Sequence, residues 1–503
     1  EVVATIVAGL PVFAAVMLLG GVAASQVLRV FLVTIVAAVM AGSLGVLVAF
    51  WREKTFQTLA LVVLGLGFWL GGCELFASNA LGRYPGSETV RHTAVGLSPL
   101  RAVMSAAVAA DSRAISADPL SDVTHRFLIY GLLLSAACLL VTMARVRIWA
   151  SQDEVPHATR MGNSLRSAGF PRTLSDGSLA VNDLDLAETA RAEHIDARGA
   201  NRRPRPHREV WDNPVLWREC ATWSHGRKVI LIRVAYLIAA GWIAVALHQQ
   251  TSPEALEAAW DRAGPMPLAA QPLAAMYVLS LAILNALAVT SITGERDGQA
   301  LDLLLATDLT PKEFLFGKLG GIVSVGGLMI LVPLLVSAYV WYRGGLSLQT
   351  LAYLCGALLT LDVFTIMLGV HSGMRYAQSR AAISVSMGTF FFLSLGVGIC
   401  IFLMISFAGS FQFQLVPFTA MILGGGVGLF AALSAGHPSG AMVLASLTVP
   451  FFTFYVLTCV LLGQDLPAFL VLLGSYGFAT AAMMVPAIFE FDFAMGRTMA
   501  ADE

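Results

Sequence analysis

The sequence predicts an all-α polytopic transmembrane helical bundle of about 11–12 spans, and two observations lead to this prediction. The chain of 503 residues is 57% hydrophobic and only 13% charged, whereas soluble domains are charged at about a quarter of their positions. Its apolar residues also come in continuous runs of roughly 20, the length that a helix needs to cross a bilayer. Because lipid offers no partners for backbone polar groups, helices are expected, and runs without alternation argue against a barrel.

The predicted spans follow one another along the chain with polar breaks between them. Eleven apolar runs have the required length: 2–20, 27–50, 56–78, 126–148, 228–248, 271–292, 319–340, 349–371, 382–407, 439–462 and 466–488. The run 416–434 is also apolar but contains three consecutive glycines from Gly424, so it is either a twelfth span or an arm of a re-entrant hairpin. We favour three crossings after residue 408, because an odd number returns the C-terminus to the cytoplasm.

The distribution of arginine orients the bundle. Arginines are concentrated between residues 144 and 233, and basic loops remain in the cytoplasm; the end of the chain from Phe491 is expected on the same side. Residues 150–210 are polar and cannot bury a core, so we interpret them as a flexible cytoplasmic linker. Acids interleave with these arginines and the net charge is −1, so nucleic acid is not an expected partner. The apolar runs make the lipid bilayer the expected partner.

The linker separates two halves that look alike, residues 1–149 and 211–503. A shift of 324 residues places Gly20-Gly21 on Gly344-Gly345, and both halves share the order span, Gly-Gly loop, span, turn and span, which indicates a duplication. The charged segment that begins at Glu295 would then have its counterpart before residue 1. We therefore expect the first half to be truncated at its N-terminal end.

That charged segment lies between two long apolar runs. Gly294 and Gly298 allow a tight exit from the preceding span, and Glu295 and Arg296 are expected to be exposed charges at the membrane edge. A short amphipathic helix should follow, because three leucines share one helical face at i, i+3 and i+4 while an aspartate lies on another. These four residues are Leu301, Leu304, Leu305 and Asp302.

A second helix is predicted directly after this short one. Thr310 has the character of an N-cap, Pro311 suits the first helical position, and Glu313 completes a capping box. The helix should begin at Pro311 and continue into the span at 319. The segment is therefore expected to form a short helix, a turn and a long helix at the water boundary.

A further short helix is predicted before the span at 228–248. Asn213 is a suitable N-cap and Pro214 a suitable first residue. Leu216 and Trp217 give the helix an apolar, interfacial character, so it can lie along the membrane surface. Arg218 and Glu219 follow as charged residues.

Two stretches, 213–223 and 291–318, resemble the permeases of ABC-2-type transporters. The resemblance lies in the helix that starts at Asn213, similar to the elbow helix of that family, and in Gly294-Glu295-Arg296 followed by Gly298 and a leucine-rich helix, similar to its coupling segment. Asp308 stands where members commonly have proline. The resemblance implies two fused permease halves in the cytoplasmic (inner) membrane, a separate ATPase that docks on the coupling segment and binds ATP and Mg²⁺, and export as the usual direction.

The chain itself is not expected to be an enzyme or to bind a cofactor. It contains no Gly-x-x-x-x-Gly-Lys-Ser/Thr motif for ATP phosphates, and none of its six cysteines forms a Cys-x-x-Cys pair, so neither a catalytic nor a metal site is predicted. The transported substrate stays open among lipids, drugs, peptides and glycans.

Asp362 leaves two alternative functions open. It lies near the middle of the predicted span 349–371, where an acid is costly and often functional. It could line a path and couple an ion-driven secondary transporter, or it could make a structural hydrogen bond. A membrane scaffold that moves no substrate is the second alternative. Near span ends, Glu74 is expected to reach the outer interface and His371 to interact with a helix dipole.

Overall fold

The computed structural model describes residues 6–11, 13, 17, 22–51, 55–77, 87–107, 122–150, 211–221, 229–251, 270–298, 309–406, 411–434 and 439–494. Within these ranges all regular structure is helical, and eleven helices are long and apolar enough to cross a membrane. The predicted all-α polytopic bundle is confirmed. The predicted first span, 2–20, lies mostly outside the described residues, as does the predicted linker beyond Ala150.

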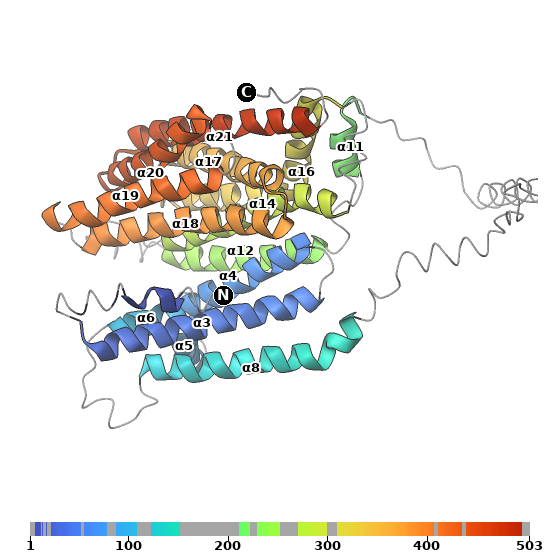
Figure 1. The fold of residues 1–503 in the computed structure, drawn as a ribbon. Helices are drawn as coiled ribbons and strands as arrows, with labels where there is room; N and C mark the ends of the chain where they lie inside the picture. Colours follow the sequence, from blue (N-terminus) through green and yellow to red (C-terminus); the bar gives the residue numbers. More distant parts are fainter. Residues whose placement is uncertain are drawn as a thin grey trace, which may run out of the picture. The chain divides into compact units, whose positions relative to one another are not determined.

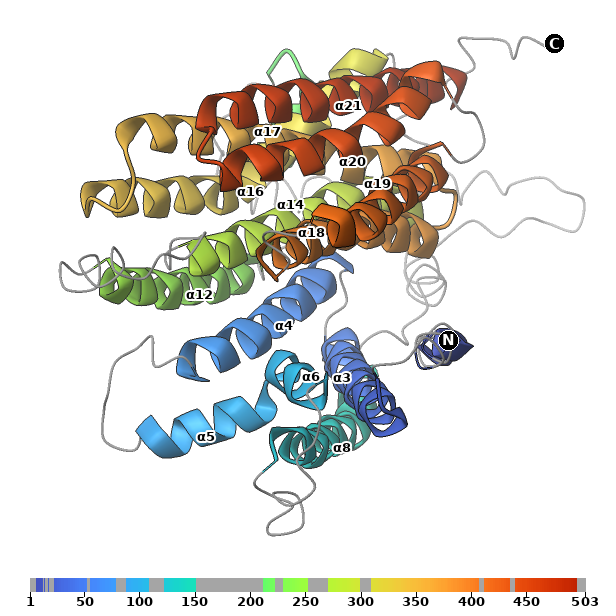
Figure 2. The same cartoon turned by 90° about the vertical axis from the view of Figure 1, so that its left-hand side faces the viewer.

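The helices follow the predicted spans closely (Figures 1 and 2). In chain order they are α3 (Ala24–Trp51), α4 (Thr55–Ala77), α5 (Ser87–Leu97), α6 (Pro99–Ala107), α8 (Val123–Ala150), α11 (Pro214–Ala221), α12 (Val229–Gln250), α14 (Ala270–Asp297), α16 (Pro311–Tyr342), α17 (Leu348–Arg375), α18 (Ser379–Ser406), α19 (Phe411–Leu433), α20 (Gly440–Leu461) and α21 (Asp465–Ala494).

The chain divides into two compact units. The larger contains Glu1–Cys138 and Asn213–Glu503, and the smaller contains Leu139–Asp212, which includes the C-terminal half of α8.

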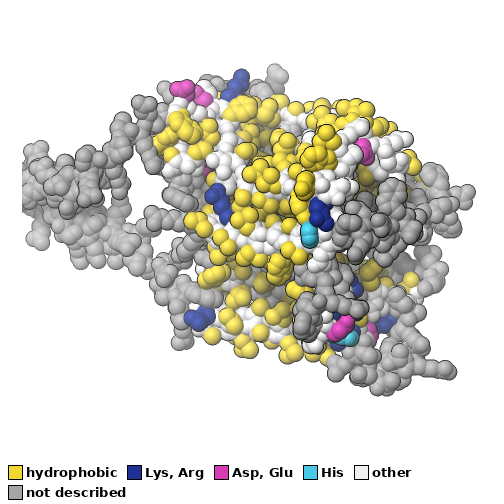
Figure 3. Space-filling model, turned by 180° about the vertical axis from the view of Figure 1, so that it is seen from behind, with side chains coloured by type: hydrophobic (Ala, Val, Ile, Leu, Met, Phe, Trp, Pro, Cys, Tyr) yellow, Lys and Arg dark blue, Asp and Glu magenta, His cyan; other side chains and the backbone are white. Residues whose placement is uncertain are grey.

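In the larger unit α19 is one continuous helix that passes through Gly424–Gly426, so this run has the length of a span and not the form of a re-entrant hairpin. Large apolar side chains such as Leu395 and Val427 remain exposed, as expected for a lipid-facing surface. The described part of the face in Figure 3 is mostly apolar.

Between α4 and α8 the chain forms two short helices, α5 and α6, which the sequence analysis did not predict. Ala102 and Ala106 of α6 are fully buried in one cluster with Val33 and Val36 of α3. Nearby, the guanidinium of Arg101 pairs with the carboxylate of Glu74 at 3.0 Å. Glu74, expected to reach the outer interface, is held by Arg101 of α6. The small side chains of Ala102 and Ala106 allow the close contact between α6 and α3.

Helix α14 forms the centre of the larger unit. Every residue from Ser280 to Thr293 is buried, and α14 packs against α4, α12, α16, α17 and α18. Contact with α17 is closest at Gly369, where an added Cβ would lie 2.6 Å from Cβ of Ala288. Asn285 also donates from Nδ2 to the Thr365 carbonyl at 3.2 Å and accepts from Ser386 Oγ at 2.8 Å. Small residues and interhelical hydrogen bonds are the usual means by which helices associate in membranes.

The C-terminal end of α19 is held by α17 and the residue that follows it. Tyr376 donates its hydroxyl to the Ala432 carbonyl at 3.0 Å, and Nε2 of His371 lies 3.2 Å from the Leu433 carbonyl. The last carbonyls of a helix have no partner within it. His371, expected to interact with a helix dipole, therefore contacts the end of a neighbouring helix.

Candidate functional site: the charged end of α14

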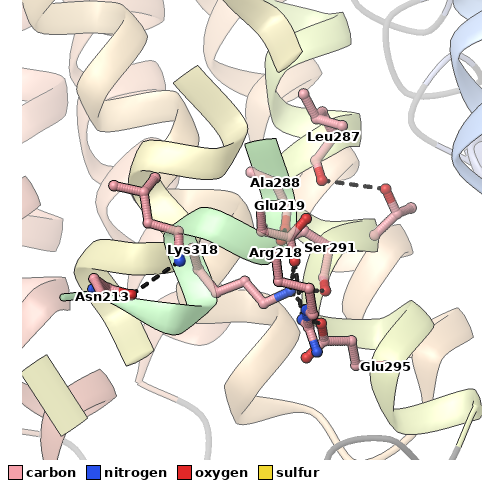
Figure 4. Close-up of polar contacts among 10 residues, drawn as sticks. Asn213, Arg218, Glu219, Leu287, Ala288, Ser291, Glu295 and Lys318 are labelled. Atoms are coloured by element: carbon pink, nitrogen blue, oxygen red, sulfur yellow. Dashed lines mark hydrogen bonds and ion pairs between the residues drawn. The ribbon is translucent and has the colours of Figure 1, made fainter. Parts of the chain in front are cut away.

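Three helix ends meet at the site. They are the C-terminal end of α14, the N-terminal turns of α16, and α11, which precedes α12 along the chain (Figure 4). The sequence prediction singled out residues from all three, and we describe first how each helix begins and then how the charges are arranged. We call this arrangement the charged tip, defined by Arg218, Glu219, Glu295 and Lys318.

Helix α16 begins as predicted. Thr310 Oγ1 accepts from the Glu313 backbone N–H at 3.2 Å, and Oε2 of Glu313 accepts from the Thr310 N–H at 2.9 Å. Pro311 is the first helical residue, where its missing N–H costs nothing. This reciprocal capping box fixes the direction in which the chain enters the long helix.

Helix α11 also begins as predicted, and its cap links it to α16. Asn213 Oδ1 accepts from the Leu216 N–H at 2.9 Å, and Nδ2 of the same side chain donates to the Glu313 carbonyl at 2.8 Å. One side chain therefore caps α11 and holds the first turn of α16. The short helix starts at Pro214, as the sequence indicated.

Glycines on α16 bring α11 very close. A Cβ added at Gly320 would lie 2.7 Å from Leu216 Cδ1, and one added at Gly321 would lie 2.6 Å from Glu219 Cβ. Gly317 makes a similar contact with the start of α11. A larger residue at Gly317 or Gly321 would force α11 to move, and one at Gly320 would displace the Leu216 side chain. Helix α11 is thus seated on α16, and the glycines are the reason that Glu219 reaches the interior.

Lys318 lies at the centre of the charged tip. It is 1% exposed, and its Nζ donates to Glu219 Oε1 at 2.7 Å, to Glu295 Oε1 at 2.5 Å and to the Ser291 carbonyl at 3.3 Å. Figure 4 shows this side chain reaching from α16 toward the carboxylates of α11 and α14. Arg218 Nη2 donates to the same two carboxylates, at 3.0 Å from Glu219 Oε1.

The charges of the tip are balanced. Two cations face two carboxylates, and a buried charge is tolerated only when it is paired in this way. Burial alone lowers the pKa of Arg218, but the carboxylates of Glu295 and Glu219 outweigh burial and raise the pKa above its ordinary value. Arg218 is therefore a permanent cation, and the tip is an electrostatic clamp between three helices.

The two residues after Glu295 bind two more helices. Arg296 Nη2 donates to the Gly373 carbonyl at 2.9 Å, and Nη1 donates to the Tyr376 carbonyl. These groups lie at the C-terminal end of α17, where carbonyls lack helical partners. Asp297 Oδ1 accepts from Ser379 Oγ at 2.6 Å, at the start of α18. Consecutive side chains at the end of α14 thus contact α11, α16, α17 and α18.

This geometry corrects two expectations. Glu295 and Arg296 are not freely exposed charges, since the Glu295 side chain is 14% exposed and both residues are bound by neighbouring helices. The chain also makes no tight exit at Gly294: α14 continues to Asp297, and Gly298 forms the turn that follows. The helix extends because its last polar side chains find partners on the surrounding helices, which a span taken alone does not reveal.

The remaining predicted site residues lie elsewhere. Leu301, Asp302, Leu304 and Leu305 fall outside the described residues, and Asp362 lies far along α17, away from the charged tip. Sequence reasoning missed the role of Lys318. Its signal was the flanking glycines, because a lysine between Gly317 and Gly320 at the start of a span indicates a close helical neighbour.

Comparison with known proteins adds no relative. No family model, no curated protein and no solved structure matches the chain. In the described residues no group of three or more His, Cys, Asp or Glu side chains is arranged to hold a metal ion. The eleven apolar helices of the described residues fit a transporter-like, multi-pass membrane protein.

Proposed function

We propose that the chain is the permease subunit of an ABC-2-type transporter, with two permease halves fused and a separate ATPase bound at residues 294–313. The ATPase supplies ATP and Mg²⁺, and the permease moves a substrate outward across the cytoplasmic membrane. In this arrangement the charged tip, the linker after α8 and the C-terminus face the cytoplasm.

The observation that carries the proposal is the position of Lys318. This buried cation joins a carboxylate of α11 to a carboxylate of α14, at the base of the segment that is proposed to dock the ATPase. A subunit driven from outside the membrane needs a stiff connection, because a mobile loop would absorb the displacement. The clamp, the glycine contacts of α16 and the capping box together supply that stiffness.

The tip is also connected to the helices that would move. A displacement of the end of α14 acts on α17 through Arg296 and on α18 through Asp297. Further along, α14 and α17 touch at Gly369 and Gly373. Motion that enters at one helix end is thus passed to a packed pair of spans, which is what alternating access between two halves requires.

The test is co-purification of the full-length protein with purified candidate ATPase subunits. Leu304→Asp places a charge on the apolar face of the proposed docking helix. The control is Leu348→Asp, at an exposed leucine (64% exposed) beyond the opposite end of α16. We expect wild type and the control to retain the ATPase and Leu304→Asp to lose it.

Two further results would contradict the proposal. One is equal recovery of the ATPase with Leu304→Asp and with wild type, and the other is no binding of any candidate by wild type. A bound ATPase whose hydrolysis is unaffected by transported compounds would instead favour the membrane scaffold. Size-exclusion profiles of each variant show whether the fold is retained.

A further inference from the structure

Asp362 is a buried acid without a hydrogen-bond partner. It lies near the middle of α17 and is 2% exposed. Neither of its carboxylate oxygens makes a hydrogen bond in the part of the chain that the structure describes. The possible structural hydrogen bond that the sequence left open is therefore not found among these residues.

The surroundings of Asp362 can be located from its neighbours on α17. Gly369 and Gly373 follow it by seven and eleven residues, so all three lie on one face of the helix. That face contacts α14, since both glycines touch its backbone or side chains. Tyr236 of α12, bonded to Ser280 of α14 at 2.7 Å, lies within electrostatic range of Asp362. The acid thus faces the junction of α12, α14 and α17.

No described cation neutralises this acid. The titratable groups in the interior of the helices packed around α17, and of α17 itself, include phenols, thiols and an imidazole: Tyr236, Tyr277, Tyr476, Cys355, Cys400 and His371. Lys318 and Arg296 are engaged at the charged tip, and Arg233 donates to the Val325 carbonyl at 2.9 Å. His371 lies nine residues further along α17, against the end of α19.

An ionised carboxylate in these surroundings is strongly disfavoured. Removal from water penalises the charged form, and an unpaired buried charge is normally avoided by neutralisation of the group. A metal ion would need several further ligands, and the described residues place no group of three or more His, Cys, Asp or Glu side chains around Asp362. A single proton neutralises the carboxylate and needs no further ligand.

We propose that Asp362 is a proton-binding site, occupied in this packed arrangement and emptied when water reaches the junction of α12, α14 and α17. The carboxylic acid then transfers its proton to that water, leaving a hydrated carboxylate, and loss of the water returns the proton. By linkage, proton concentration and hydration of this junction bias each other. This holds whether the cycle is driven by an ATPase or by an ion gradient.

The first test is infrared spectroscopy of the full-length protein in lipid nanodiscs. We expect wild type to show the C=O stretch of a protonated carboxylic acid at neutral pH, and this band should be absent from Asp362→Asn. Asp465→Asn is the matched control, because Asp465 lies at the outer end of α21 and accepts from Thr350 Oγ1 at 2.8 Å. The control should keep the band.

The second test is the melting temperature as a function of pH. The unfolded chain loses the Asp362 proton near its ordinary acid range while the packed bundle keeps it, so the stability of wild type should fall as pH rises. Asp362→Asn lacks this loss, so its melting temperature should rise relative to that of wild type as pH increases from about 4 toward about 7. Labelling wild type with ¹³C-aspartate assigns the infrared band should the variant fail to fold.

Two results would overturn the inference. One is a wild-type spectrum without a protonated aspartic acid band at any pH in this range, and the other is a melting-temperature difference that does not change with pH. Neither measurement involves an ATPase. A negative outcome here therefore leaves the proposed transporter coupling standing, and loss of ATPase binding leaves the proton site standing.

Discussion

Replacement of Lys318 by methionine removes the central cation of the charged tip while keeping a side chain of similar length. The change leaves Glu219 and Glu295, whose side chains are 3% and 14% exposed, with Arg218 as their shared cation. Removal of one partner from a buried ion pair typically costs about 3–5 kcal/mol, because the other charge stays buried. Since Arg218 still contacts both carboxylates, we expect a cost near the lower end, about 3 kcal/mol.

A second substitution makes this prediction specific to charge. In the Lys318→Met background, Glu219→Gln removes the surplus negative charge and leaves Arg218 paired with Glu295. The double variant should therefore be more stable than Lys318→Met alone, by on the order of 1–2 kcal/mol. Simple loss of packing predicts the opposite order, because it adds a second defect to the first.

The assay is the free energy of unfolding in mixed detergent micelles for wild type, both single variants and the double variant. Lys312→Met serves as the control, since Lys312 is exposed on the first turn of the same helix, and it should change stability by no more than about 0.5 kcal/mol. A Lys318→Met variant as stable as this control would refute the reasoning, and so would a double variant whose cost equals the sum of its parts.

Two further substitutions test how the tip is held. Gly321→Ala should lower the free energy of unfolding by about 1–3 kcal/mol, because its new methyl would lie 2.6 Å from Glu219 Cβ. The control Gly327→Ala, on the same helix, meets nothing within 4 Å and should be neutral or slightly stabilising. Thermal unfolding of the two variants distinguishes these outcomes. Arg296→Gln should increase hydrogen exchange at the last turn of α17 and leave its first turn unchanged, because the guanidinium bonds only the C-terminal carbonyls. An equal increase in hydrogen exchange at the first and last turns of α17 would contradict the role of Arg296 as a cap of its C-terminal end.

Much of the fold was predictable because its signals are local. Continuous apolar runs specify helices in lipid, where each helix satisfies its own backbone. The starts at Pro214 and Pro311 followed from caps and capping boxes, which involve residues within a few positions of one another. The run around Gly424–Gly426 was left open by its sequence, because consecutive glycines fit either a span or a hairpin, and the structure forms a continuous helix there.

The charged tip was not predictable, because its partners are distant in sequence. Lys318 and Glu219 are 99 residues apart, and Arg218 and Glu295 are 77 apart. Sequence patterns show that Glu295 is charged but not that a cation from another helix meets it, so an exposed position was the natural expectation. For the same reason the extension of α14 to Asp297 was not predicted, because the last turn of α14 depends on contacts with α17 and α18.

Lys318 and Asp362 show why this difference matters for function. Both are ionisable side chains within apolar helices, and both are almost completely buried. Lys318 has two carboxylates and a carbonyl around its ammonium group, so its charge is compensated in this arrangement and its role is to hold helices together. Asp362 has no compensating group among the described residues. A charge that one conformation does not compensate has to be neutralised there or satisfied in another conformation. A buried residue whose charge is paired, such as Lys318, therefore stabilises one conformation. A buried residue whose charge is not paired, such as Asp362, makes two conformations differ in their affinity for a proton.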